Sequence, residues 1–413
     1  MNRLGRRSWP ADPAPVRAVH LGLGAFHRAH QAWYTHRAGG EPVGIAAFTG
    51  RRPAAAVPLA DQDGRYGLLV RGPAEDAVEV VTSIVEAYDG ARVDLLAERL
   101  RRPELAVVTM TVTEAGYRRD PDGGLDTGDP DVAADLAALS GAALGDTDTP
   151  CPLRTAPARL VYGLAARWRS DAGPVAVLPC DNLIGNGPAA RRVVRDLAGR
   201  VDAGLAGWID EQVSFVSSEV DRITPAATDA DRAVVAEHLG LRDEASVVTE
   251  PFTEWVLAGE FPNGRPDWQD AGARFVDDVA PFEQRKLWLL NGAHSLLAYA
   301  GLARGHASMA EAVGDGTLLG WVRSWWEEAA RHLPLPSAEV DDYTGALLAR
   351  FGNPRLRHLL SQVAADGSQK LPVRVLPVLR AERAAGRVPA GAAHVLGAWL
   401  AHVRGDGGKV SDP

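Results

Sequence analysis

The stretch Val16-Arg17-Ala18-Val19-His20-Leu21-Gly22-Leu23-Gly24-Ala25-Phe26-His27 decides the fold. Its first six residues form an apolar run typical of a strand, and a Gly-x-Gly sequence follows directly. The first glycine permits a tight turn, and the second lets the backbone approach a pyrophosphate at the N-terminus of the next helix. His27 stands where this fingerprint usually has its third glycine. The stretch therefore predicts the first strand, turn and helix of a dinucleotide-binding domain.

The residues that follow supply the context that this short fingerprint needs, because a Gly-x-Gly sequence alone is a weak signal. A helix-like segment covers residues 28–37, and a second apolar strand covers residues 43–48. This order indicates an α/β fold with a Rossmann-type doubly wound sheet. His27 and His30 are three residues apart and could instead face a metal, but no acidic or cysteine partner stands near them in the sequence, which disfavours that alternative.

The end of the second strand bears on the choice of cofactor. An Asp or Glu normally stands there and binds the adenosine ribose. This chain reads Phe48-Thr49-Gly50-Arg51-Arg52, and its nearest acid, Glu41, precedes the strand. Two arginines at this point could accept the 2'-phosphate of NADP or could simply be solvated. The residues alone leave NAD and NADP both open.

Two further buried strands are predicted at residues 105–112 and 175–178. The first leads into the loop Thr113-Glu114-Ala115-Gly116-Tyr117, and the second into Pro179-Cys180-Asp181-Asn182. The carboxyl ends of parallel strands face the ligand crevice in such sheets. We therefore expect the 113–117 loop to border the cofactor and Asn182 to lie at the same edge.

A second group of polar residues occurs in Lys286-Leu287-Trp288-Leu289-Leu290-Asn291-Gly292-Ala293-His294. On an α-helical wheel, His294 lies about 80° and Asn291 about 140° from Lys286, and the neighbouring positions are apolar. Burial lowers the pKa of a lysine, and a lysine near neutrality can act as a general base. The alternative is a structural helix with a snorkelling lysine, which the spacing alone favours.

Composition excludes several classes of protein. The 413 residues suffice for two or three domains, and 23% charged residues with a net charge of -9 argue against nucleic acid or an anionic membrane as the main partner. No apolar run approaches a membrane span, and the basic N-terminus lacks the apolar region of a signal peptide. Cys151 and Cys180 form no CxxC pair. We expect a cytoplasmic protein that binds no metal.

Taken together, these stretches resemble the polyol-specific long-chain dehydrogenases, the mannitol dehydrogenase and fructuronate reductase family. The resemblance runs from Gly22 to Pro372 in family order, although the chain is short for the family. The stretches that carry it are Gly22-Leu23-Gly24-Ala25-Phe26-His27-Arg28-Ala29-His30-Gln31, Thr111-Val112-Thr113-Glu114-Ala115-Gly116-Tyr117, Cys180-Asp181-Asn182-Leu183, Val220-Asp221-Arg222-Ile223-Thr224-Pro225, Glu250-Pro251-Phe252 with Trp255, residues 286–294, and Asp366-Gly367-Ser368-Gln369-Lys370-Leu371-Pro372.

The resemblance implies a role for each matching residue. Lys286 is the general base, Asn291 and Asn182 hydrogen-bond the reacting oxygen, and His294 positions the substrate. Asp221, Lys370 and Arg374 border the substrate. The cofactor-binding residues are Gly22, Gly24, Ala25, Phe26, Thr113 and Glu114. Two domains are implied, an extended Rossmann domain at residues 1–280, in which strands near 247–257 and 274–276 extend the sheet, and a mainly α-helical C-terminal domain at residues 281–413.

Three functions follow as hypotheses. The first is an NAD-dependent dehydrogenase, with NADP possible, that interconverts D-mannitol and D-fructose. The second is a hexuronate reductase, whose substrate carboxylate favours Arg or Lys around it. The third is a non-catalytic dinucleotide sensor, which has no use for the Lys286, Asn291 and His294 set. The expected partner is a small polyol, ketose or hexuronate, and the expected state is a monomer or small homo-oligomer.

Overall fold

The computed structural model describes residues 1–50, 52–141, 144–145, 151–356, 358–408 and 410–412. The chain divides into two compact units. The first contains residues 1–70 and 76–279, and the second contains residues 71–75 and 280–413. The short segment Arg71–Glu75, a turn in the sequence of the first unit, groups with the second. There Asn353 donates to the Arg71 carbonyl at 3.0 Å.

A six-stranded parallel sheet forms the centre of the first unit. Its strands are β1 (Val16–Leu21), β2 (Gly44–Phe48), β5 (Ile84–Tyr88), β6 (Val107–Met110), β7 (Val175–Pro179) and β8 (Val213–Phe215). The order is β5-β2-β1-β6-β7-β8, and every neighbouring pair is parallel. Counted along the chain, this is the 3-2-1-4-5-6 order of dinucleotide-binding sheets. The predicted Rossmann-type fold is confirmed.

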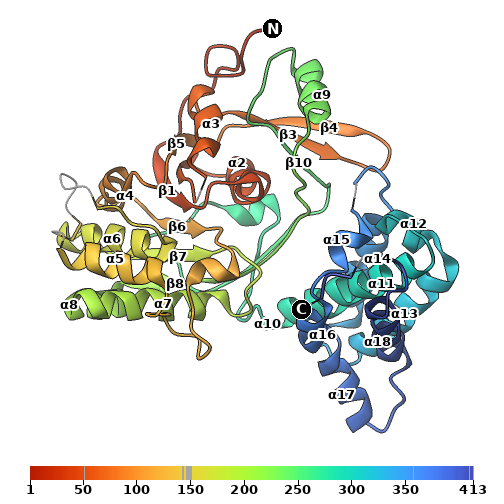
Figure 1. Ribbon diagram of the computed structural model, residues 1–413. Coiled ribbons are helices and arrows are strands. Elements are labelled where there is room, and N and C mark those ends of the chain that lie inside the picture. The colour runs from red at the N-terminus through yellow and green to blue at the C-terminus, as the bar shows by residue number, and fades with distance from the viewer. Residues whose placement is uncertain (51, 142–143, 146–150, 357, 409, 413) are drawn as a thin grey trace. The chain divides into compact units, whose positions relative to one another are not determined.

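Alternating residues of each strand enter two separate cores, because successive side chains of a strand point to opposite faces. Val19 and Leu21 pack in one core with α4 (Val93–Leu100), α6 (Ala156–Arg169) and α7 (Asn186–Val201). Ala18 packs in the other, toward α1 (Ala25–Ala29) and α2 (Gln31–Arg37). Figure 1 shows α5 (Pro130–Gly141) and α8 (Ala203–Gln212) grouped with α6 and α7. The sheet is thus covered on both faces.

Two small sheets correct the expectation that later strands extend the large one. One has the order β10-β3-β4, from β3 (Tyr66–Arg71), β4 (Asp76–Val81) and β10 (Val247–Thr249). The other has the order β12-β11-β9, from β9 (Ser217–Asp221), β11 (Glu254–Ala258) and β12 (Arg274–Phe275). The sequence pattern did not predict β5. Residues 82–83 separate β4 from β5, and the two strands belong to different sheets.

The helix expected at residues 28–37 is interrupted. It consists of α1 and α2, and His30 between them leaves helical geometry with φ -122° and ψ -91°. The His30 ring bonds the Glu254 carbonyl at 2.9 Å and lies against Trp255, whereas His27 stacks on His20. The two histidines therefore point to different neighbours. Among the described residues, no group of three or more His, Cys, Asp or Glu side chains could hold a metal ion.

The second unit is built of helices around α11 (Gly292–Ala303), which is buried over most of its length and packs against α12 (Met309–Gly314), α13 (Gly316–Ala330), α15 (Leu360–Val363) and α18 (Ala390–Val403). The remaining elements are α10 (Ala280–Arg285), the π-helix η4 (Lys286–Asn291), α14 (Ser337–Phe351), α16 (Gly367–Arg374) and α17 (Leu376–Ala384). Within the described parts of the chain, no helix has both the length and the apolar character needed to cross a membrane.

Candidate active site

The glycine-rich loop after β1 has the form that a dinucleotide requires. Gly22 has φ +108°, and a Cβ there would lie 2.3 Å from the Thr111 carbonyl oxygen, so only glycine fits. A Cβ on Gly24 would meet only the Gly22 carbonyl, at 3.6 Å, so the space in front of Gly24 is open. Ala25 and Phe26 open α1 directly behind it. A side chain at Gly24 would fill the place where the fingerprint brings a pyrophosphate, and the loop therefore fits NAD.

The buried imidazole of His20 supports this loop, a role that no pattern in the sequence predicted. The two ring nitrogens of His20 contact the hydroxyls of Thr109 at 2.8 Å and Thr111 at 3.0 Å, and the Thr111 hydroxyl donates to the Gly22 carbonyl at 2.8 Å. His20 also stacks on His27 with ring centroids 3.4 Å apart. Burial lowers the pKa of His20 to about 3 and holds that of His27 well below its usual value. Both rings are therefore neutral near pH 7.

The loops that leave β6 and β7 are tied to each other. Thr113 and Glu114 are exposed at the start of the short helix η2 (Glu114–Tyr117), whose last residue Tyr117 is buried. The Tyr117 hydroxyl donates to the Asp181 carboxylate, and that carboxylate also accepts the Leu183 N–H at 3.0 Å. Asn182 is the central residue of the turn so formed and is exposed. The structure thus places the Thr113, Glu114 and Asn182 candidates at the carboxyl edge of the sheet.

Asp221 ends β9, opposite Glu254 of β11, and is buried. The next residue, Arg222, fixes this point of the chain. Its guanidinium donates to the carbonyls of Ala29 and Glu250 and lies 4.7 Å from the Trp33 ring centroid. Burial lowers the pKa of Arg222 to about 10, so it stays charged near neutrality. The turn after Asp221 is therefore held by a buried cation.

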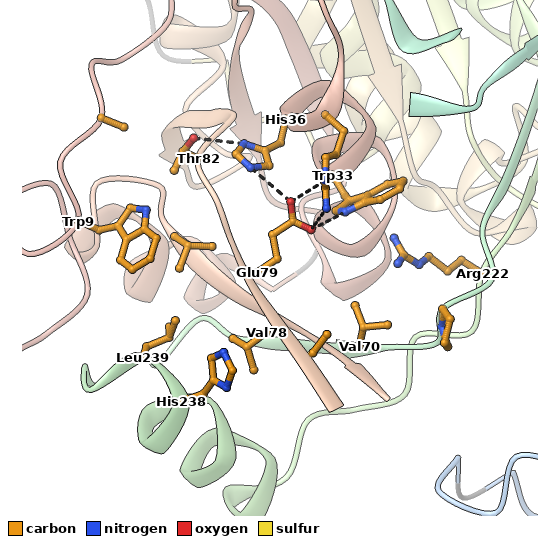
Figure 2. A pocket seen from close by; sticks show the side chains of 15 residues that line it. Trp9, Trp33, His36, Val70, Val78, Glu79, Thr82, Arg222, His238 and Leu239 are labelled. Atoms are coloured by element: carbon orange, nitrogen blue, oxygen red, sulfur yellow. Dashed lines mark hydrogen bonds and ion pairs between the residues drawn. The ribbon is translucent and has the colours of Figure 1, made fainter. Parts of the chain in front are cut away.

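A cavity of about 940 Å³ lies in the first unit, and Arg222 is one of the residues that line it (Figure 2). Its wall carries Glu79, which accepts the Trp33 indole N–H at 3.0 Å and pairs with Arg37 at 2.7 Å and His36 at 3.6 Å. No residue predicted for the active site lines this cavity. The cavity and the candidate catalytic residues are thus distinct features of the molecule.

In the second unit, Lys286 and Asn291 are the first and last residues of the π-helix η4, and His294 follows on α11. The α-helical wheel expected for residues 286–294 is therefore wrong at this point, because π-helical bonds join residues five apart. The Gly292 N–H donates to the Leu287 carbonyl, which is such a bond. The rotation around the helix axis from Lys286 to Asn291 is consequently smaller than the 140° or so of an α-helix, and the two residues lie more nearly on one face.

The surroundings of these residues are partly as expected. Leu289, Leu290, Ala293 and Leu297 are buried, as the apolar arc predicted, whereas Lys286 and Asn291 are partly exposed. The His294 ring is buried against the rings of Phe351 and His358, with centroid distances of 4.8 and 4.9 Å. These contacts orient the imidazole.

Both cations predicted on α16 are hydrogen-bonded within the unit. Arg374 donates to the Ser295 hydroxyl at 3.2 Å and to the Asn291 carbonyl at 3.4 Å, which brings it to the end of η4. Lys370 donates to the Ala365 carbonyl at 2.6 Å. Burial is the main cause that lowers the pKa of each, and their mutual repulsion also lowers that of Lys370. Arg374 is thus bonded to Asn291, whereas Lys370 is bonded to the loop that precedes α16.

The fold and these residues define a dinucleotide-dependent oxidoreductase. Family models agree over nearly the whole chain: the mannitol dehydrogenase Rossmann domain matches residues 16–270, and the mannitol dehydrogenase C-terminal domain matches residues 278–412. The chain belongs to the mannitol dehydrogenase family. It is an NAD-dependent enzyme of the class that acts on secondary alcohols.

Three relatives illustrate the range of the family. D-mannonate oxidoreductase of Escherichia coli (strain K12) is 37% identical, over 91% of this chain and 78% of the relative. Mannitol 2-dehydrogenase of Cereibacter sphaeroides is 36% identical, over 96% of this chain and 83% of the relative. Pseudomonas fluorescens mannitol 2-dehydrogenase, solved as a ternary complex with NAD and D-mannitol, superposes with a TM-score of 0.80 at 32% identity, over 100% of this chain and 82% of that one.

Proposed function

We propose that this enzyme oxidises a sugar alcohol to a ketose with NAD, and that D-mannitol and D-fructose are its substrate pair. The observation that carries the proposal is the π-helix η4, which places the amine of Lys286 and the amide of Asn291 about one helical turn apart. The similarity to mannitol 2-dehydrogenases over nearly the whole chain supports the same assignment.

In the proposed reaction, Lys286 takes the proton of the substrate hydroxyl. The amides of Asn291 and Asn182 donate hydrogen bonds to the oxygen as negative charge develops on it, the role of an oxyanion hole. His294 orients the substrate, and Asp221, Lys370 and Arg374 contact its other hydroxyls. Bound NAD supplies the hydride acceptor. The proposal needs no metal, since the amides and the protonated lysine stabilise the alkoxide.

A hexuronate reductase remains the second candidate because of one specific feature. Arg374 lies beside Asn291, and its guanidinium suits the carboxylate that distinguishes an aldonate from a polyol. The relative named D-mannonate oxidoreductase supports this alternative at nearly the same identity as the mannitol 2-dehydrogenase does.

Initial rates with a panel of polyols and aldonates, each with NAD and with NADP, test both candidates. We expect the highest kcat/KM for D-mannitol with NAD. A higher kcat/KM for D-mannonate would select the hexuronate reductase. NADH binding without turnover of any member of the panel would indicate the non-catalytic sensor instead. The oligomeric state and the cytoplasmic location stay predictions.

A further inference from the structure

Two tryptophans of α13 bond to the backbone of the π-helix. The indole N–H of Trp325 donates to the Trp288 carbonyl at 2.7 Å, and that of Trp326 donates to the Leu289 carbonyl at 2.8 Å. Both indoles are buried, with exposed fractions of 0% and 6%. Two consecutive side chains of α13 thus donate hydrogen bonds to two consecutive carbonyls of η4.

The Trp325 bond falls where the hydrogen-bond pattern of the helix departs from the α form. In an α-helix the Trp288 carbonyl would accept the N–H of Gly292, four residues on. In this protein the Gly292 N–H donates to Leu287 instead, five residues back. The Gly292 N–H is therefore not the donor to the Trp288 carbonyl. The Trp325 indole N–H donates to that carbonyl instead.

The residue that follows the π-helix permits this approach. A Cβ on Gly292 would lie 2.6 Å from the Trp325 indole nitrogen and 2.8 Å from its ring carbons. Any larger residue would displace the indole from the Trp288 carbonyl. Gly292 is therefore needed for its lack of a side chain, although its backbone is ordinary αR.

We propose that Trp325 and Trp326 are positioning residues that hold residues 286–291 in the π form and thereby set the relative placement of Lys286 and Asn291. The inference rests on the proposed function, in which Lys286 is the base and Asn291 the amide donor. Without the indole donors, the α form of residues 286–291 becomes more stable than the π form, because the Trp288 carbonyl then accepts the Gly292 N–H. Asn291 then rotates away from Lys286 around the helix axis.

The test replaces each tryptophan by phenylalanine, which keeps most of the ring and removes the N–H. Trp321→Phe is the matched control: Trp321 lies on the same helix, but its ring stacks on His394 at 4.6 Å. We expect Trp325→Phe and Trp326→Phe to lower kcat for alcohol oxidation by about 10- to 100-fold, the size expected for a misplacement of catalytic groups. The pH at which the oxidation rate rises should also move. NADH affinity and the Trp321→Phe enzyme should stay within about twofold of wild type.

A double-mutant cycle separates positioning from general damage to the core. In a Lys286→Ala/Asn291→Ala background, Trp326→Phe should change kcat by less than about twofold, because a residue that acts through Lys286 and Asn291 has no effect once both are gone. Equal losses in the two backgrounds would overturn the proposal.

A crystal structure of the Trp325→Phe/Trp326→Phe enzyme tests the proposal even if none of the polyols is a substrate. We expect residues 286–291 to return to α geometry, with the Gly292 N–H on the Trp288 carbonyl. An unchanged π-helix would overturn the inference whatever the substrate is, whereas a wild-type enzyme inactive on the whole panel would refute only the proposed function.

Discussion

The hydroxyl of Tyr117 donates to the carboxylate of Asp181, and this bond joins the loops that follow two neighbouring strands of the large sheet. Removal from water is the main cause that raises the pKa of Asp181 to about 6, against the opposing effect of the Tyr117 bond, and Glu114 raises it further. The charged form of Asp181 is thus held beside Asn182 at a cost in stability. Such a cost is common at functional sites.

Replacement of Asp181 should reveal that cost. An acid whose pKa is higher in the folded than in the unfolded state makes stability fall as pH rises between the two values, here from about 4 to about 6. Asp181→Asn keeps an oxygen for the Leu183 N–H and cannot ionise. We expect its melting temperature to exceed that of wild type at pH 7.5 and the difference to shrink at pH 4. A variant less stable than wild type at pH 7.5 would show that the carboxylate stabilises the loop.

The glycine-rich loop gives a prediction about cofactor binding. Gly24→Val should weaken NADH binding by more than about 100-fold while the fold is kept, because the new side chain enters open space reserved for the pyrophosphate. Fluorescence titration measures the affinity, and circular dichroism checks the fold. Gly22→Val is the contrasting variant and should destabilise the unit itself, since Gly22 has φ +108° and faces the Thr111 carbonyl. Unchanged NADH affinity in Gly24→Val would contradict the assignment of this loop.

The arginines that follow β2 bear on whether the enzyme also uses NADP. Arg51 lies outside the described residues, and Arg52 is exposed. The sequence has no acid from Thr49 to Ala60, so nothing in that segment repels a 2'-phosphate. We expect measurable activity with NADP beside the NAD activity, and a selective loss of the NADP activity in Arg52→Ser. Equal kcat/KM for NADP in the variant and wild type would show that Arg52 does not contact the phosphate.

Lys286→Ala tests the base. We expect turnover in alcohol oxidation to fall by about 10²- to 10⁴-fold with little change in NADH affinity, because the lost interaction is with the reacting hydroxyl. In wild type the rate should rise with pH through one ionisation, and this step should vanish in the variant. Asn291→Ala should lower the rate and leave the ionisation in place, since an amide does not titrate. Nearly full activity in Lys286→Ala would mean that the lysine is structural.

Because His20 and His27 are buried as neutral rings, we expect the protein to lose stability in acid. His20 and His27 have folded-state pKa values below 6.5, so the unfolded chain binds more protons and stability falls as pH drops below about 6.5. Each ring contributes at most about 1.4 kcal/mol per pH unit. Urea unfolding of His27→Phe at pH 5 and pH 7.5 should show a smaller difference than wild type. His238→Gln, at an exposed position, is the control and should match wild type.

The main features of the fold were predictable because they depend on local patterns. The glycine loop, the β1 strand and the order of strand and helix follow from residues close together in the chain, and the family stretches follow in the same order. The placement of β5, β10 and β11 was not predictable in this way. Short apolar runs fit any sheet equally well, and only pairing with distant strands decides which sheet receives them.

By itself, the sequence determined that this chain has a dinucleotide-binding domain and a helical domain, that it belongs to the mannitol dehydrogenase family, and that Lys286, Asn291 and His294 occur together. The tertiary structure alone decided the geometry of that group. A helical wheel assumes that each carbonyl finds its donor four residues on. Here the Gly292 N–H donates five residues back, to Leu287, and the carbonyls of Trp288 and Leu289 accept the indole N–H groups of Trp325 and Trp326, 37 residues further along the chain. Hydrogen bonds between distant residues override the local helical period, and no reading of residues 286–294 alone contains them.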